Sequence, residues 1–141
     1  MGKNYCPRTI ITKKFAHVHF FLYLCTEIVQ DMEITTLLEY TDRSQLRQWL
    51  TAHHASEKEC WVTMYRTKIP RTDCMPYLDV VEEALCFGWI DSTVKRLPDG
   101  RCAQRLSPRR KNSHWTELNR QRCADLEQRG LMTDAGRERI Q

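Results

Sequence analysis

Residues 89–107 read WIDSTVKRLPDGRCAQRLS, and this stretch predicts a β-hairpin. Residues 89–97 are aromatic and partly β-branched, which favours a strand. Pro98-Asp99-Gly100 is a strong turn signal, because proline fixes φ, aspartate bonds its own backbone and glycine accepts a positive φ. Residues 101–107 then return as the partner strand, and Pro108 ends the pairing because it has no N–H to donate.

The segments on either side of this hairpin predict helices and one more strand. Residues 42–54 carry apolar side chains at helical spacing after a capping box, and Gly88 and Gly130 are typical helix ends. Residues 60–66 are short, aromatic and partly β-branched, which predicts a buried strand. The expected fold is therefore α+β, a small antiparallel sheet packed with about four helices. The expected strands are 60–66, 89–97 and 101–107, and the expected helices are 42–54, 76–87, 113–129 and 133–141.

Length and charge are those of an ordinary globular protein. The chain has 141 residues, 41% hydrophobic and 28% charged, which fits one domain with a modest core better than a disordered chain. Its net charge of +4 excludes an acidic tail protein and a histone-like polycation. The charge is segregated: twelve basic and six acidic residues give +6 in residues 94–141, whereas six and ten give −4 in residues 32–93. This basic last third predicts an anionic partner if its cations share one surface.

The first 31 residues differ from the rest of the chain. Lys13-Lys14 precede an apolar run over residues 15–25 that resembles the start of a signal peptide. The run contains two histidines, lacks a small-x-small cleavage site and has about half of the ~20 residues that a membrane span requires. We therefore interpret residues 1–31 as a non-native or disordered N-terminal extension, with a signal peptide as the alternative, and residues 32–141 as a single domain.

The chain has seven cysteines, and their spacing bears on metal binding and on redox state. No two are spaced as CxxC, and His114 is the only histidine in the C-terminal half, so no zinc site is expected. Their odd number and apolar surroundings predict reduced, buried thiols in a cytoplasmic protein rather than a disulfide framework. No phosphate-binding loop, dinucleotide fingerprint or HExxH motif occurs, so no cofactor is expected.

The densest polar chemistry lies on the hairpin and at the start of the following helix. On a regular strand Asp91 and Lys95 share a face, and Arg105 on the returning strand reaches them. The basic run 109–111 then meets the start of the 113–129 helix, where free N–H groups and Ser113 would bind an anion. This helix is expected to be capped by Asn112 or Ser113, with Trp115, Leu118, Cys123 and Leu126 on one face. The candidate ligand-binding residues are Trp89, Asp91, Lys95, Arg105, Arg109, Arg110, Ser113, Trp115 and Asn119.

Several of these candidate residues also have a purely structural interpretation. The basic run 109–111 by itself is more often a solvated loop, and Asp91 by itself more often pairs with Lys95 or Arg105 than acts as a catalytic acid or base. Tryptophans at positions such as 89 and 115 are more often core anchors than stacking platforms.

Three function classes remain open. The first is a binding module for a small anion. The second is a hydrolase- or transferase-type enzyme in which Asp91 is the general base and Arg109 or Lys95 stabilises negative charge. The third is a weak nucleic-acid binder, which the modest net charge disfavours. The sequence predicts no membrane span and leaves the oligomeric state open.

An ordered set of motifs carries a family resemblance. The set consists of EEALCFGWID at 82–91 followed by Lys95-Arg96, PRR at 108–110, SHWTELN at 113–119, and GLMTDAG at 130–136. Over residues 33–138 the chain resembles the bacterial YdeI/OmpD-associated family, also labelled bacteriocin protection. It departs mildly at Ser92 and Thr116, where the family commonly has glycine and serine.

The resemblance implies a small bacterial α+β protein linked to tolerance of bacteriocins or antimicrobial peptides. It implies no established catalytic residue. It also implies a further C-terminal helical segment, which would make residues 32–141 a C-terminally truncated member.

Overall fold

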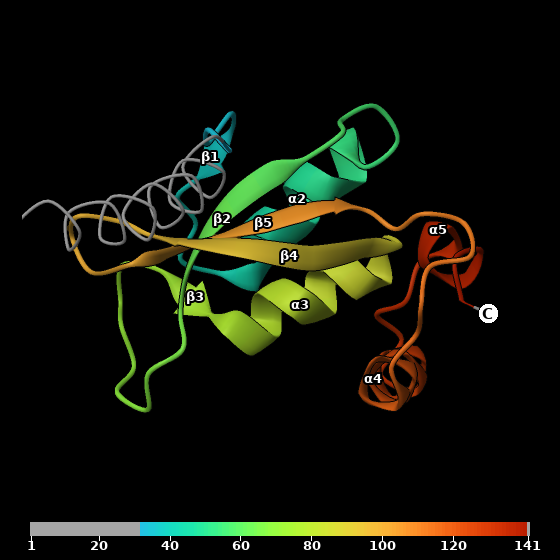
Figure 1. Ribbon diagram of the computed structural model, residues 1–141. Coiled ribbons are helices and arrows are strands. Elements are labelled where there is room, and N and C mark those ends of the chain that lie inside the picture. Colours follow the sequence, from blue (N-terminus) through green and yellow to red (C-terminus); the bar gives the residue numbers. More distant parts are fainter. Residues whose placement is uncertain (1–31, 141) are drawn as a thin grey trace, which may run out of the picture. The chain divides into compact units, whose positions relative to one another are not determined.

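The predicted hairpin forms one edge of the sheet, where the edge strand β4 (Trp89–Arg96) pairs antiparallel with β5 (Cys102–Pro108). The computed structural model describes residues 32–140, so the interpretation of residues 1–31 lies outside the described residues (Figure 1). The chain from Ile34 onward forms one compact unit. The other elements are β1 (Leu37–Leu38), α2 (Arg43–His53), β2 (Cys60–Tyr65), β3 (Met75–Pro76), α3 (Tyr77–Cys86), α4 (Glu117–Gln128) and α5 (Asp134–Arg137).

The α+β prediction is confirmed, and the three long strands lie within one residue of their expected ends. The sheet has the order β1-β2-β5-β4, and β5 runs antiparallel to both β2 and β4. The sheet is mixed rather than purely antiparallel, because the two-residue strands β1 and β3 both pair parallel with β2. Such short strands carry no sequence period, so the pattern did not predict them.

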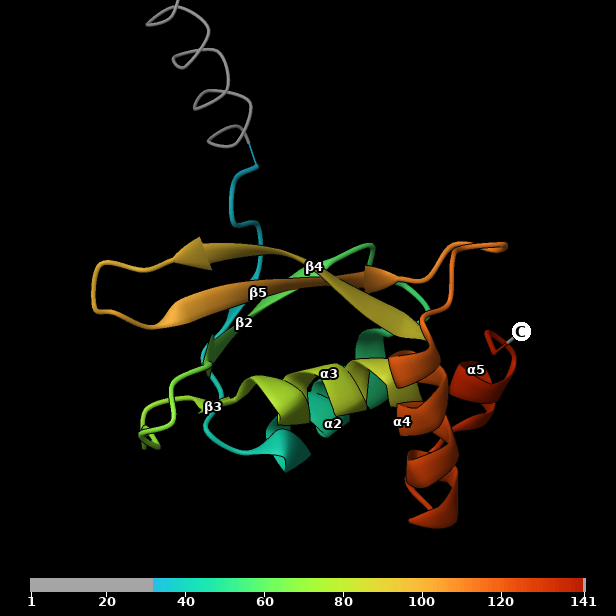
Figure 2. The same cartoon turned by 60° about the horizontal axis from the view of Figure 1, so that its bottom comes forward.

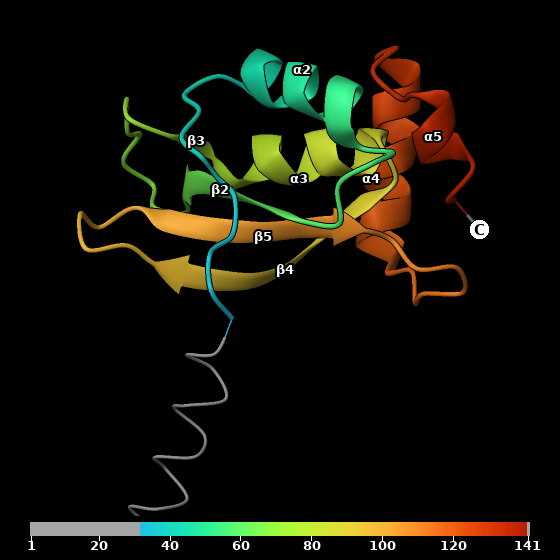
Figure 3. The same ribbon diagram turned by 90° about the horizontal axis from the view of Figure 1, so that it is seen from above.

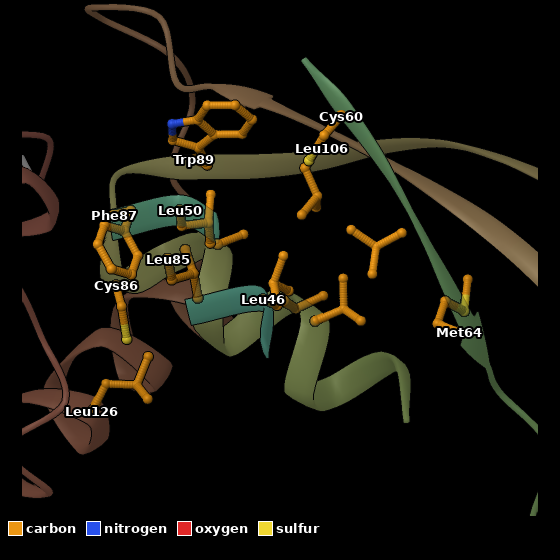
Figure 4. Close-up of a cluster of buried hydrophobic side chains, with 14 of the residues drawn as sticks. Leu46, Leu50, Cys60, Met64, Leu85, Cys86, Phe87, Trp89, Leu106 and Leu126 are labelled. Carbon is orange, nitrogen blue, oxygen red and sulfur yellow. The ribbon is translucent and has the colours of Figure 1, made fainter. Parts of the chain in front are cut away.

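Helices α2 and α3 lie together on one face of the sheet, and α4 and α5 lie at the end where β4 begins and β5 ends (Figures 1 and 3). Between the helices and the sheet, Cys60 and Met64 of β2 and Leu106 of β5 pack with Leu46 and Leu50 of α2 (Figure 4). All five side chains have no exposed surface, and they form the centre of the hydrophobic core. None of the helices within residues 32–140 is both long enough and apolar enough to cross a bilayer.

A bulge interrupts β4. Asp91 pairs with Leu106 of β5, and the next paired residue, Val94, pairs with Gln104, so Ser92 and Thr93 together oppose Arg105 and β4 has one extra residue. The fully buried Gln104 fills the gap, since its side-chain amide donates to the carbonyl oxygens of both residues at 3.2 and 3.3 Å. A bulge of this kind changes which face each following side chain occupies.

Two acidic residues of α3 are buried under arginines. Glu83 is 1% exposed, and its carboxylate accepts hydrogen bonds from Arg43 Nε at 2.8 Å and Arg47 Nη1 at 3.0 Å. Glu82 is 8% exposed and accepts from Arg43 Nη1 and from Arg129 Nη1, which follows α4. This ion-pair network joins α2, α3 and the end of α4.

The C-terminal segment docks on the end of α3 through backbone contacts. Thr133 donates both its N–H and its hydroxyl to the Cys86 carbonyl oxygen. Gly136 lies directly against Cys86, so a Cβ at position 136 would clash with that carbonyl and lie 2.5 Å from the Met132 Sδ. The close approach of α5 to α3 therefore requires glycine at this position.

The five described cysteines form no disulfide bonds. Four of them are buried and Cys102 is half-buried. Burial raises the pKa of Cys60 to about 12 and that of Cys86 to about 11.

Because alkylation requires the thiolate, we expect Cys60 and Cys86 to resist iodoacetamide in the native protein at pH 8. Their labelling should be at least roughly 100-fold slower than in the urea-unfolded chain, measured for each peptide by mass spectrometry. Cys102, which is half-buried, provides the internal comparison in the same digest. Equal labelling of all three in the native protein would contradict this burial.

Candidate functional site

Arg109, which follows β5, is a buried cation with incomplete bonding. It is 2% exposed, and its Nη1 donates to Ser113 Oγ at 3.2 Å and to the His114 carbonyl oxygen at 3.1 Å. Its guanidinium carbon lies 3.8 Å from the centre of the Trp115 ring, a cation–π contact. Nε and Nη2 are buried without a hydrogen-bond partner, and no carboxylate among the described residues forms an ion pair with this guanidinium.

This arrangement is electrostatically expensive for the folded protein. Burial lowers the pKa of Arg109, and the neighbouring Cys123 and Asp91 oppose that effect. A buried charge usually has an ionic partner, because removal from water costs several kcal/mol per ion. The two free N–H groups of a guanidinium form a fork that matches a carboxylate or phosphate. The arrangement can therefore bind a small anion.

Asp91 faces the helices and binds Tyr77, the first residue of α3. The Tyr77 hydroxyl donates to Asp91 Oδ2 at 2.7 Å, and the Arg66 guanidinium lies 3.9 Å from the centre of the Tyr77 ring. Burial and the hydrogen bond with Asp91 raise the pKa of Tyr77, whereas Arg66 and Arg122 lower it. The Arg66 guanidinium thus packs on the Tyr77 ring, Arg122 acts on Tyr77 through its charge, and Asp91 acts on Arg109 in the same way.

The structure separates Lys95 and Arg105 from Asp91, so the predicted convergence of these three residues is wrong. Lys95 Nζ lies 5.5 Å from the centre of the Trp61 ring, on the face of the sheet opposite to Asp91. Arg105 lies on that same face, where it pairs with Glu59 and donates to Ser92 Oγ. The bulge after Asp91 is the cause for Lys95, because it breaks the alternation on which the prediction relied. Arg105 faces away because the partner of Asp91 is Leu106, the next residue on β5.

The predicted anion site at a helix N-terminus is also wrong. Helix α4 begins at Glu117, and its N-cap is Thr116, whose hydroxyl accepts from the Asn119 N–H at 3.2 Å. Neither Asn112 nor Ser113 caps the helix; Ser113 binds Arg109 instead, four residues before the first helical residue.

The remaining candidates have different environments. Trp115 precedes α4 and is buried. Leu118 was expected on the buried face of this helix but is 61% exposed. Arg110 is exposed. Asn119 Oδ1 accepts from Arg122 Nη1 at 3.1 Å, which places Asn119 beside the cluster. Trp89 is 1% exposed and donates to the His54 carbonyl oxygen, so the core-anchor interpretation of Trp89 is correct.

Sequence reasoning therefore included Arg109, Ser113 and Trp115, which the structure brings into contact, and Asp91, whose charge acts on Arg109. It missed Tyr77, Arg66 and Arg122, which come from other elements. Only the position of Tyr77 in the first turn of a predicted helix could have indicated one of them. In residues 32–140 no group of three or more His, Cys, Asp or Glu side chains could hold a metal ion.

The motif segments of the sequence meet around this cluster. The Arg109 N–H donates to the Gly88 carbonyl oxygen at 2.9 Å, and Trp115 packs under the Arg109 guanidinium. Thr133 binds the Cys86 carbonyl two residues before Gly88. No curated protein and no solved structure matches the chain. One family, described as Domain of unknown function (DUF8412), matches residues 38–139, and the chain therefore belongs to this family.

Proposed function

We propose that this protein binds a small anion, a phosphate or carboxylate, through the buried guanidinium of Arg109. The observation that carries the proposal is the pair of buried, unpartnered N–H donors on Nε and Nη2. A bound oxyanion would accept from both and supply the missing negative charge. Arg122 adds a second cation near the Tyr77–Asp91 pair.

Access to Arg109 requires movement of the segment that covers it. Arg109 Nη1 donates to Ser113 and His114, so the segment that ends at these two residues contacts the guanidinium. Arg110, Lys111 and His114 of this segment are exposed. We infer that the segment opens to admit the anion, and that its cationic side chains attract the anion as it approaches.

The basic last third supports a small ligand better than a nucleic acid. Four of its arginines pair with carboxylates within the fold rather than forming one basic surface. They are Arg101, Arg105, Arg129 and Arg137. Their positive charge is therefore largely neutralised locally.

The resemblance to the YdeI/OmpD-associated family supports a proposed setting for this binding, namely tolerance of bacteriocins or antimicrobial peptides. The motifs that carry the resemblance include Asp91, Arg109 and Trp115, which are members of the proposed site. The family label describes a phenotype of the bacterium. It therefore suggests the condition under which the anion would be bound and does not identify the anion.

The substitution Arg109→Met tests the proposal. Methionine fills similar space without the charge, so the variant without ligand should be at least as stable as the wild type. Phosphate at about 100 times its Kd should stabilise the wild type by about 2.7 kcal/mol and leave the variant unchanged. Urea unfolding with and without phosphate, at constant ionic strength, measures both effects.

The matched control is Arg110→Met, which removes an exposed cation one residue away. This variant should retain the stabilisation by phosphate. If Arg109→Met also retained it, the proposal would be wrong.

A further inference from the structure

We propose that the ligand is an amphiphilic anion, whose charged group lies at Arg122 and Arg109 and whose hydrocarbon part lies in the groove between α3 and α4. This inference rests on the proposed function and adds the chemical class of the ligand. The groove has a volume of about 430 Å³, which is within the usual size of small-molecule sites. Leu78, Leu118 and Arg122 line it, and the two carboxylates in its lining, Glu82 and Asp125, are both paired with Arg129.

The groove is lined by residues adjacent in sequence to Tyr77 and Asn119. Leu78 follows Tyr77 in the first turn of α3, and Leu118 precedes Asn119 in the first turn of α4. Helix α4 crosses α3 at a steep angle (Figure 2). Residues of both first turns line the groove. Arg122 links the groove to Tyr77, because it lines the groove and its charge lowers the pKa of Tyr77.

The groove exposes apolar surface that the fold does not use. Leu78 is 47% exposed and Leu118 is 61% exposed, whereas most large apolar side chains in residues 32–140 are buried. At Arg122 only Nη1 has a hydrogen bond within the described residues, to Asn119, which leaves Nε and Nη2 able to bind an anion. A hydrocarbon group beside a free cationic fork matches a ligand with one apolar and one anionic part.

Monooctyl phosphate and inorganic phosphate are the probes for this inference. Each buried CH₂ group increases affinity about fourfold, so burial of only two methylenes should give at least a tenfold lower Kd for monooctyl phosphate. Titration calorimetry on the full chain, below the micelle-forming concentration, measures both dissociation constants. The double variant Leu78→Gln/Leu118→Gln should lose this tenfold advantage and keep its affinity for inorganic phosphate.

The control is Ile69→Gln, which removes a 77% exposed apolar side chain in the loop between β2 and β3. This control should keep the advantage of monooctyl phosphate. Circular dichroism and the retained affinity for phosphate show that the double variant is folded.

Two results would overturn the inference and leave the proposed function intact. One is equal affinity of the wild type for the two probes. The other is tighter binding of monooctyl phosphate that the double variant does not weaken. If the wild type bound neither probe, the proposed function would fail, and this inference would fail with it.

Discussion

Replacing Glu83 with glutamine should lower the free energy of unfolding by about 3 kcal/mol, the low end of the range for breaking a buried ion pair. The carboxylate is 1% exposed and accepts from Arg43 and Arg47. Glutamine has nearly the same shape but no charge, so both guanidiniums would lose their anionic partner. The loss lies at the low end because the two arginine side chains are 25% and 31% exposed and remain partly solvated.

Urea unfolding followed by tryptophan fluorescence measures this loss. The matched control is Glu127→Gln, which breaks the pair between Arg137 and a carboxylate that is 49% exposed. An exposed pair contributes at most about 1 kcal/mol, so the control should remain close to the wild type. Equal losses in the two variants would show that burial of Glu83 does not govern its contribution.

Replacing Gly136 with alanine should cost about 3 kcal/mol, because the added methyl group has no space. The new Cβ would clash with the backbone carbonyl of Cys86, which is fixed in the last turn of α3. We expect α5 to separate from α3 and the hydrogen bonds of Thr133 to be lost. Amide hydrogen exchange at Thr133 would report this local undocking, and urea unfolding would report the total loss.

The control for this prediction is Gly130→Ala. A Cβ at Gly130 would meet no atom within 4 Å, but the residue has a φ of +71°. That left-handed conformation costs an alanine about 1 kcal/mol, so the control should be affected less and should keep the protection of Thr133. The assignment of the effect to a steric clash would be wrong if Gly130→Ala cost as much as Gly136→Ala.

The elements that could be predicted are those with a strong local signal. The Pro98-Asp99-Gly100 turn and its two flanking strands were predicted closely, because turn chemistry and strand period act within a few residues. The capping box at Asp42 likewise placed the start of α2 correctly, and both of its reciprocal hydrogen bonds are present. In these segments local preferences and the final fold agree.

The site was predicted only in part, because its geometry depends on two non-local effects. Arg109 recruits Ser113 as a hydrogen-bond partner, and the helix then begins at the next good cap, Thr116. The bulge in β4 depends on Gln104 from the neighbouring strand, and residues 89–97 alone carry no sign of it. Tyr77, Arg66 and Arg122 reach the cluster through packing of distant segments, which no spacing rule describes.

The bulge also separates the evolutionary constraints on the two faces of β4. Asp91 precedes it and belongs to the cluster beneath the helices, whereas Lys95 follows it and lies over Trp61. Deleting either Ser92 or Thr93 would leave a single residue opposite Arg105, so the later residues of β4 would keep their partners and their faces. Single substitutions on either face can therefore accumulate independently, and the strand can lose its one extra residue without exchanging its two faces.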